Sequence, residues 1–513
     1  MKALIINPNI VTQKGDFFGT GIPYMPIIPA YIAAYLRGKE CDVKVIDAFG
    51  EDPSIKRVEN EKFIVQGLSY DKIIGRINGS ETLICIYAGH LVEHFVVINI
   101  IDKIRNKHPR IKIAIIENSQ AVTAYSLVNA KKEFFDAKAD FIIYGEPEEA
   151  VFNILKKLSS KKHSAKPSEQ SNMNKSPDTR KFSEINNIIY EEKGEIKINP
   201  ISHRPADLDS LPFPAWDLFP IKNYWKLGYA HATYQTSYLP LLSSRGCPFN
   251  CAFCVIPSTN LRKWNKRSAK NVFDEISHFV KKYRIKEFHF EDLNAIIDKE
   301  RIQELCRYII DAHLNIKLKF VSGIKIECLD EKTIVLLKQA GCDYISFSPE
   351  SGSNNVLRLM NKPFNHEYAI EMLKVMERMD ITTQACFILG FPGEKKADIT
   401  RTEKYLYRLF RTGLDETAIL VMTPVPGSRT YEQARGLHKN LSALTFSPVW
   451  RKDYDYYNKK RLKMYVISQL IKISYHPVKF FNNIFHALIG KFKNKIEMTI
   501  YRVIKVYFFT KSQ

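Results

Sequence analysis

Three cysteines close together near the middle of the chain are the residues whose spacing points most directly to chemistry. They are Cys247, Cys251 and Cys254, in the stretch Ser-Arg-Gly-Cys-Pro-Phe-Asn-Cys-Ala-Phe-Cys over residues 244–254. The whole sequence of 513 residues holds only nine cysteines, so chance is a poor explanation for such a cluster. In a reducing compartment, closely spaced thiols indicate metal ligands. The C-x3-C-x2-C pattern therefore predicts a metal centre.

The number of clustered thiols distinguishes two kinds of metal centre. A structural zinc site uses four ligands in a closed tetrahedron, but the next cysteine is the distant Cys306, and His278 lies outside the usual zinc-finger spacing. A 4Fe-4S cluster held by three thiolates leaves one iron open to an external ligand. The amino and carboxylate groups of S-adenosylmethionine (SAM) can chelate such an iron. We therefore predict a 4Fe-4S cluster that binds SAM, with structural zinc as the alternative.

The elements in the first 155 or so residues alternate between short apolar strands and helical stretches. We expect helices over Ile28–Arg37 and Glu93–Asn106, among others. The expected strands are Ala3–Asn7, Val43–Asp47, Leu83–Tyr87, Ile111–Ile116 and Phe141–Tyr144. Nearly continuous apolar strands separated by helices predict a parallel, doubly wound α/β sheet of Rossmann-like type. Ligands of such sheets bind at the carboxyl ends of the strands, and the glycine-containing loop Pro8–Pro26 is long enough to line such a site.

From about Tyr238 the alternation of strands and helices resumes, and the three clustered cysteines lie within this part of the chain. Expected helices include Ser268–Lys282, Lys299–Ala312, Glu331–Ala340 and Tyr368–Met379. The expected strands are Leu241–Ser244, Glu287–Glu291, Lys317–Ser322, Tyr344–Ser348, Gln384–Leu389 and Ala418–Met422. Successive βα units of this kind predict a (β/α)6 partial TIM-type barrel. The cysteines would then follow the first barrel strand, at the end of the barrel where chemistry collects.

The remaining segments suggest how the chain is divided. Residues 159–180 are rich in Ser, Lys, Asn and Pro and predict a flexible insertion. A short hairpin is expected around Asn187–Ile198, followed by a proline-rich connector at Ala206–Pro214. We expect a Rossmann-like domain over 1–157, the insertion and connector over 158–237, the barrel over 238–446, and a basic helical region over 447–513.

The cysteine motif and several other blocks resemble one family. They are similar to the radical SAM superfamily, in particular its subfamily with an N-terminal cobalamin (B12)-binding-type domain, over roughly residues 1–440. Besides the cysteines, the matching blocks are Pro26–Ala33, Tyr144–Glu149, Asp207–Pro214, His289–Asp292, Pro349–Ser353, Phe387–Glu394 and Thr423–Ser428. The resemblance implies an enzyme that cleaves SAM reductively to a 5′-deoxyadenosyl radical.

The resemblance also implies roles for individual residues. Cys247, Cys251 and Cys254 match the cluster ligands, and Phe253 matches the aromatic residue near the SAM adenine. Lys325 stands where the family often has Arg, and would meet the SAM carboxylate as a point charge. The other matches are Glu350, Ser351 and Gly352 near the SAM ribose and methionine groups, Glu291 and Asp292 near the SAM ammonium, and Gly390 against the adenine. Glu350 is the residue expected to act in catalysis.

Each of these assignments has a purely structural alternative. Glu350 could pair with Arg358, Phe253 could be an ordinary core residue, and Gly390 could serve a tight turn. The four cysteines scattered downstream fit small buried hydrophobic residues better than further cluster ligands. These are Cys306, Cys328, Cys342 and Cys386.

Whether cobalamin binds decides which reaction the resemblance implies. The N-terminal part lacks the Asp-x-His-x-x-Gly stretch of histidine-ligated cobalamin, and His90 and His94 are ordinary lone histidines. Residues Glu117–Gln120 stand where relatives carry a pair of glycines, so larger side chains there would either block the corrin or reshape its pocket. With cobalamin, the expected reaction is methylation of an unactivated carbon or a phosphinate. Without it, the alternative is radical cyclisation, rearrangement or dehydrogenation of a similar substrate.

The amino-acid composition indicates a folded cytoplasmic protein and so limits the partners that we expect for it. Hydrophobic residues make up 45% and charged residues 26%, as in a folded protein. The cysteine usage, and the absence of a signal-like segment or of a long apolar run, favour the cytoplasm. We expect a small-molecule substrate and an electron donor such as ferredoxin or flavodoxin.

The net charge of +21 is concentrated near the end of the chain. Residues 451–513 hold 14 Lys and Arg against three acidic residues, a net of +11. Apolar residues interleaved with lysines over Tyr465–Phe492 are typical of a helix lying on an anionic membrane, which would suit a lipid-like substrate. A helical cap over the barrel is the alternative. A metal-stabilised nucleic-acid-binding protein is a distant third hypothesis, because it leaves the Glu350 and Gly390 blocks without a purpose.

Overall fold

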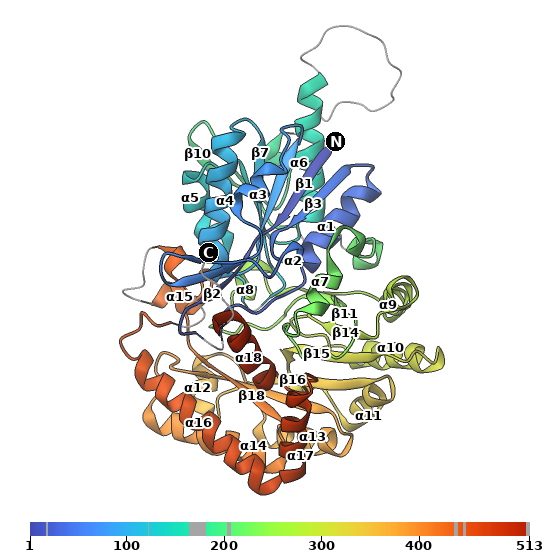
Figure 1. Ribbon diagram of the computed structural model, residues 1–513, viewed down its shortest axis with the longest axis vertical. Coiled ribbons are helices and arrows are strands. Elements are labelled where there is room, and N and C mark those ends of the chain that lie inside the picture. The colour runs from blue at the N-terminus through green and yellow to red at the C-terminus, as the bar shows by residue number, and fades with distance from the viewer. Residues whose placement is uncertain are drawn as a thin grey trace.

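The computed structural model contains two large sheets stacked end to end, with helices around each (Figure 1). It describes residues 1–508 except 17–18, 122, 164–180, 203–206, 435–439 and 445–447. The first sheet has seven strands in the order β10-β9-β8-β7-β6-β1-β3, and the second has six in the order β11-β14-β15-β16-β17-β18. The predicted α/β class is therefore confirmed.

The first sheet is parallel over five strands and is covered on both faces. Its parallel strands are β1 (Lys2–Asn7), β3 (Asp42–Asp47), β6 (Leu83–Ala88), β7 (Lys112–Glu117) and β8 (Phe141–Ile143). One face packs on α1 (Ile27–Gly38) and α6 (Glu148–His163). The other packs on α3 (Tyr70–Gly75), α4 (His94–Lys107) and α5 (Leu127–Asp136). Burial on both faces explains why these strands are apolar at nearly every position.

Two features of this half differ from the sequence expectation. The hairpin of β9 (Ile188–Glu192) and β10 (Glu195–Ile198) extends the first sheet, because β9 pairs antiparallel with β8. The expected hairpin is therefore present and continues the first sheet, and the division of the chain into domains stays a prediction. The loop after β1 contributes β2 (Ile10–Gln13) to a small antiparallel sheet with β5 (Phe63–Gln66) and β4 (Lys56–Glu59). Most of the predicted flexible insertion lies outside the described residues.

The second sheet is the predicted partial barrel. Its parallel strands are β11 (Tyr238–Leu241), β14 (Glu287–Phe290), β15 (Lys317–Ile324), β16 (Cys342–Glu350), β17 (Thr382–Leu389) and β18 (Glu416–Val421). The helices between them are α9 (Ala269–Tyr283), α10 (Lys299–Asp311), α11 (Glu331–Gln339), α13 (His366–Arg378) and α14 (Lys396–Thr412). The predicted strand Leu241–Ser244 is in fact split. β12 (Ser244–Gly246) leaves the barrel and pairs antiparallel with β13 (Trp264–Lys266).

The two halves are joined by one continuous apolar core. Buried residues of α1, of the connector and of barrel helices such as α9 belong to the same cluster, in which Trp216 and Tyr224 are among the largest fully buried side chains. The connector itself contains α7 (Ile221–Lys226). Because this shared core is closely packed, it fixes the orientation of the two sheets.

Four shorter helices complete the two halves. They are α2 (Ala48–Glu51), α8 (Ile256–Thr259), α12 (Asn354–Leu359) and α15 (Arg429–Gln433).

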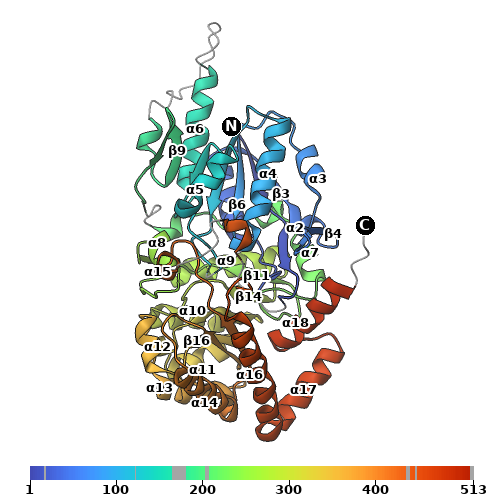
Figure 2. The same cartoon turned by 90° about the vertical axis from the view of Figure 1, so that its left-hand side faces the viewer.

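The C-terminal region is helical, as predicted. It consists of α16 (Tyr454–Tyr475), α17 (Pro477–Leu488) and α18 (Lys495–Val503), which lie along the outside of the barrel half (Figure 2). α16 packs on α14 and β18, and the backbone N–H of Lys495 at the start of α18 donates to the Glu416 carboxylate at 2.5 Å. Among the described residues, no helix combines the length and apolar character needed to cross a bilayer.

Candidate active site

The three clustered cysteines lie in the loop between β12 and α8. All three are free thiols of intermediate exposure. Burial raises the pKa of each thiol, that of Cys247 to about 11, and neighbouring thiols add to the effect at Cys247 and Cys254. Such a loop holds thiolates only when a cationic group compensates them, so the donor set fits an iron–sulfur cluster. Within the described residues, no three His, Cys, Asp or Glu side chains, the three cysteines included, are gathered closely enough to hold a single metal ion.

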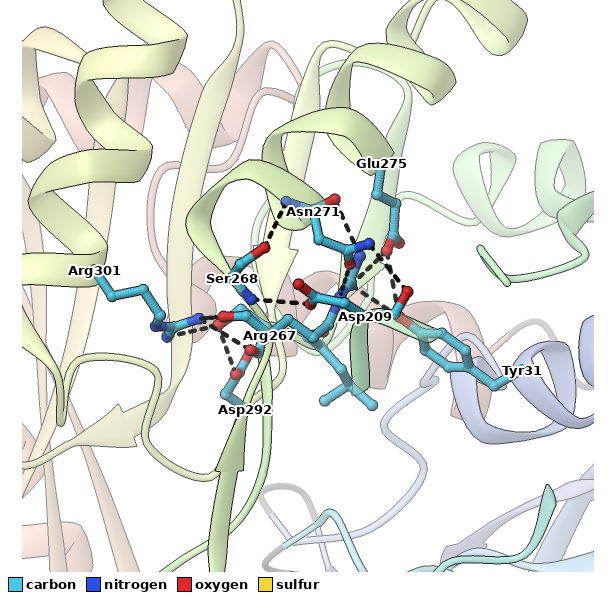
Figure 3. Close-up of polar contacts among 10 residues, drawn as sticks. Tyr31, Asp209, Arg267, Ser268, Asn271, Glu275, Asp292 and Arg301 are labelled. Atoms are coloured by element: carbon cyan, nitrogen blue, oxygen red, sulfur yellow. Dashed lines mark hydrogen bonds and ion pairs between the residues drawn. The ribbon is translucent and has the colours of Figure 1, made fainter. Parts of the chain in front are cut away.

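Buried polar groups hold the backbone that leads into this loop. Asp292, directly after β14, accepts hydrogen bonds from the Ser243 N–H at 3.0 Å, the Ser243 hydroxyl at 2.8 Å and the Ser244 hydroxyl at 2.6 Å. Arg301 donates to the Ser243 carbonyl at 2.9 Å (Figure 3). Both oxygens of Asp292 are therefore already used in positioning the loop, and the role predicted for Asp292 at the SAM ammonium stays a prediction.

A second polar group in Figure 3 ties the N-terminal half to the barrel half. Arg267 contacts the Glu275 carboxylate at 2.5 Å and donates to the Tyr31 hydroxyl of α1 at 3.1 Å. Asp209 of the connector accepts from the Ser268 N–H at 2.9 Å, at the start of α9. The connector, α1 and the first barrel helix are thus locked together behind the cysteine loop.

Arg245 links the cysteine loop to the first sheet by a buried ion pair. Its guanidinium contacts Glu148 at 2.6 and 3.0 Å and Glu146 at 3.3 Å, and the three side chains are at most 3% exposed. The carbonyl oxygen of the Gln120 side chain accepts from the Gly246 N–H at 2.9 Å. Two residues preceding Cys247 are therefore anchored to loops at the carboxyl ends of β7 and β8.

Glu350 and Lys362 form a buried pair beside the cysteines. The Lys362 ammonium lies 2.5 Å from a Glu350 carboxylate oxygen and donates to the Ser348 carbonyl at 2.8 Å. It also lies 6.0 Å from the centre of the Phe253 ring and acts electrostatically on all three thiols. Although burial opposes its charge, Glu350 and Cys251 raise the pKa of Lys362. Glu350 itself has φ of +62°, a left-handed conformation that costs a non-glycine residue energy and clusters at functional sites.

Three other residues predicted to contact SAM lie near this pair, and each of them contacts other protein groups in the structure. Phe253 packs on a small apolar cluster that includes Met360 and Ile388. The Ser351 hydroxyl lies 3.0 Å from that of Thr402 on α14. A Cβ on Gly352 would meet the Arg401 carbonyl at 2.6 Å, so close packing on α14 requires glycine there.

Lys325 and Gly390 each contact other parts of the chain in the structure. Lys325 donates to the Pro363 carbonyl at 3.0 Å, and its ammonium is 5.0 Å from the centre of the Phe249 ring. Gly390 has φ of +76° and its carbonyl accepts from Arg451 at 3.0 Å, so the C-terminal region occupies the space beside it. The SAM contacts predicted for these residues remain predictions.

A cavity of about 60 Å³ lies where the carboxyl ends of the two sheets face each other. Its lining includes Tyr24, Tyr87, His90, Asn118, Gln120 and Glu291. The Glu291 carboxylate accepts from His231 Nδ1 at 2.8 Å when that nitrogen carries a proton. Burial opposes ionisation of Glu291, yet His231 outweighs it and lowers the pKa of Glu291. The ring of Tyr24 lies between those of His90 and His231, with centroids 4.7 and 4.6 Å away.

Sequence reasoning missed three residues that the structure brings to the site. Arg245 could have been noticed as a buried-strand charge two residues before the cysteine motif, between the small residues Ser244 and Gly246. Lys362 and His231 carry no local signal, because their partners lie 12 and 60 positions away along the chain.

Comparison with known proteins identifies the chemistry that this loop serves. Residues 241–406, which hold the cysteine loop, Lys325 and the Glu350–Lys362 pair, match the radical SAM superfamily. The barrel half of the chain is therefore a radical SAM domain. The resemblance seen in the sequence is thereby confirmed, and the protein is a radical SAM enzyme.

Relatives of this radical SAM enzyme align with both halves of the chain. An uncharacterised methyltransferase of Pyrococcus horikoshii is 25% identical over 92% of this chain and 90% of its own length. The cytidylyl-2-hydroxyethylphosphonate methyltransferase of Streptomyces wedmorensis is 25% identical, over 83% of this chain and 80% of its own. Among solved structures, the cobalamin-dependent SAM radical enzyme OxsB superposes with a TM-score of 0.61 at 19% identity. That match covers 84% of this chain but 55% of OxsB, and it shows the shared fold.

Proposed function

We propose that this radical SAM enzyme methylates an unactivated carbon in a cobalamin-dependent reaction. The observation that carries the proposal is a loop of three half-buried free thiols, placed beside the cavity between the barrel and the carboxyl edge of the first sheet. Two relatives aligned over most of this chain are named methyltransferases, and the similar fold of OxsB was solved with aqua-cobalamin bound.

The residues that would hold the cluster are Cys247, Cys251 and Cys254. A reduced 4Fe-4S cluster supplies the electron that cleaves SAM to a 5′-deoxyadenosyl radical. The fixed ammonium of Lys362 offsets the negative charge of the thiolates and orients Glu350, whose second oxygen is then available to a hydroxyl of the ligand. The buried Arg245 and Asp292 contacts keep the loop in place during the reaction.

The residues around the cavity favour cobalamin binding in one respect and oppose it in another. The cavity lies at the edge where α/β sheets bind their ligands and is lined by polar and aromatic side chains. At about 60 Å³ it has room for a few water molecules and is far smaller than a corrin needs. Gln120 is 5% exposed, and its side-chain oxygen accepts from the Gly246 N–H. It belongs to the segment 117–120, where the resemblance implies a pair of glycines. Cobalamin would therefore have to displace Gln120 and its neighbours.

The same observation favours a second candidate function. If Gln120 stays in place, the cavity takes a smaller substrate, and the radical acts on it without cobalamin. The reactions expected in that case are cyclisation, rearrangement or dehydrogenation. The metal-stabilised nucleic-acid-binding hypothesis has no support from the comparisons, which name enzymes.

The partners follow from this chemistry. We propose a small-molecule substrate and a cytoplasmic electron donor such as ferredoxin or flavodoxin. We also propose that the basic C-terminal region brings the enzyme to the inner face of a membrane, where a lipid-like substrate would be presented.

Anaerobic reconstitution with iron and sulfide tests the proposal. The protein is given SAM and dithionite, with and without added cobalamin, and 5′-deoxyadenosine release and corrin retention on gel filtration are measured separately. Release of 5′-deoxyadenosine together with retention of the corrin supports cobalamin-dependent methylation. Release of 5′-deoxyadenosine without corrin retention supports the second candidate function. Iron-loaded protein that leaves SAM intact under strong reductant would contradict both. The Gln120→Gly variant sharpens the result, because it should increase corrin retention if Gln120 limits the space.

A further inference from the structure

Helix α17 exposes its apolar side to solvent, whereas a helix that covers a core buries that side. None of its residues is buried, whereas the helices of both sheets bury one apolar face. A surface helix normally directs its apolar stripe inward and its polar side to water. In α17 the apolar side points away from the protein, so the folded chain gives this face no covering within the described residues.

The polar side of α17 is the side that attaches it to the barrel. Lys479 forms an ion pair with Glu377 of α13 and contacts Asp415 before β18 at 3.3 Å. Burial lowers the pKa of the Lys479 ammonium, but Asp415 and Glu377 outweigh it and raise the pKa. The helix is therefore attached by this ion pair together with the packing of Ala487 on the main apolar core, and its exposed apolar residues lie on the other side.

The outward side carries a continuous set of large apolar residues, which we call the α17 face. Its spacing of three and four residues is that of one helix stripe. The members and their exposed fractions are Val478 72%, Phe481 62%, Ile484 42%, Phe485 60%, Leu488 81% and Ile489 48%. Contiguous exposed apolar residues of this kind mark interaction sites, whereas isolated ones need no explanation.

Exposed positive charge follows this face along the chain. Lys491 and Lys493 come directly after the helix and are exposed. The sequence from residue 451 onward has a net charge of +11. A protein partner could match the apolar stripe alone, but the combination of an aromatic and aliphatic stripe with a lysine-rich surround is complementary to an anionic bilayer surface.

We infer that the α17 face inserts into the headgroup region of an anionic lipid bilayer. Insertion buries the apolar side chains, leaves the flanking lysines at the phosphates, and keeps the Lys479 attachment to the barrel intact. The inference gives a specific surface to the proposed membrane contact, but it does not depend on the radical chemistry. The barrel is thereby held at a fixed height above the lipid.

Co-sedimentation of the full-length protein with vesicles tests the inference. Wild type should bind phosphatidylglycerol vesicles far better than phosphatidylcholine vesicles, and salt should weaken the binding. Each large side chain moved from water into the bilayer is worth about tenfold in partitioning. The triple variant Phe481→Gln, Phe485→Gln and Leu488→Gln should therefore lower the partition coefficient by about a hundredfold or more.

A matched control separates this effect from a general loss of surface hydrophobicity. The triple variant Val58→Gln, Ile198→Gln and Val449→Gln changes residues exposed by 53%, 48% and 49% elsewhere on the protein, and it should bind vesicles like wild type. Equal binding by wild type and the α17 variant would overturn the inference. So would a wild-type dimer that the α17 variant converts to a monomer, with no lipid binding by either. The amount of 5′-deoxyadenosine released without vesicles should be the same in all three proteins, which tests the enzymatic proposal separately.

Discussion

Removing the Arg245 charge should destabilise the junction between the two halves in a strongly pH-dependent way. Arg245→Met keeps most of the volume but leaves the carboxylates of Glu146 and Glu148 buried, with exposures of 2% and 0%, without their cation. Breaking one partner out of a buried pair costs about 3–5 kcal/mol. For an unfolding unit of 150–250 residues this corresponds to a drop in Tm of about 6–20 °C.

The pH dependence follows from the carboxyl groups that are left behind. Burial raises the pKa of Glu146 to about 7, even though Arg245 opposes the shift. Without Arg245 that pKa rises further above the unfolded value of 4.5. A carboxyl whose folded pKa is raised favours the folded state below the unfolded pKa, and that contribution is lost as the pH rises through the folded pKa. The difference in Tm between wild type and Arg245→Met should therefore reach its full size at pH 8. Near pH 5.5 it should be at most about half as large.

Differential scanning fluorimetry of the anaerobic apoprotein at both pH values measures this effect. The triple variant Arg245→Met, Glu146→Gln and Glu148→Gln is the control and should recover most of the lost Tm, because no unpaired charge remains. Iron bound after reconstitution should fall in the single variant and recover in the triple, since Arg245 stands two residues before Cys247. A single variant that melts like wild type at pH 8, or that loses the same Tm at both pH values, would refute the reasoning.

Three further predictions concern the barrel. Cys251→Ala should abolish iron binding after reconstitution, measured by iron content and absorbance near 400 nm, whereas Cys386→Ala at a similarly shielded position should leave both unchanged. Lys362→Met should retain iron but slow SAM cleavage at least about tenfold, because Glu350 loses its charged partner. Lys362→Arg should lose less, and equal rates for all three proteins would remove Lys362 from the site. Burial opposes ionisation of Glu287, but its hydrogen-bonded and charged partners, His289 and Lys319, lower the pKa of Glu287 to about 2. Its stabilising effect is therefore present above pH 4.5 and fades as the pH falls toward 2. The Tm difference between wild type and Glu287→Gln should shrink over that range, and a constant difference would count against the assignment.

The sequence by itself determined the cluster motif and the order of the elements. The C-x3-C-x2-C spacing is local, so three thiols on one short loop specify a three-coordinate site wherever that loop lies. The alternation of apolar strands with amphipathic helices is also local, because period 2 and period 3.6 are set by the backbone. That is why the five parallel strands of the first sheet and the later barrel strands were found within a few residues of their observed bounds.

Tertiary structure alone decided which charges meet the cysteines and how the halves share a cavity. The contacts of Lys362 with Glu350, of His231 with Glu291, and of Arg245 with Glu148 all join elements separated in the sequence. A charge at one position has many possible partners in sequence, and only packing selects one of them. The same limitation applies to α17, where the sequence pattern established an amphipathic helix. Only the fold showed that its charged side faces the barrel and its apolar side faces outward.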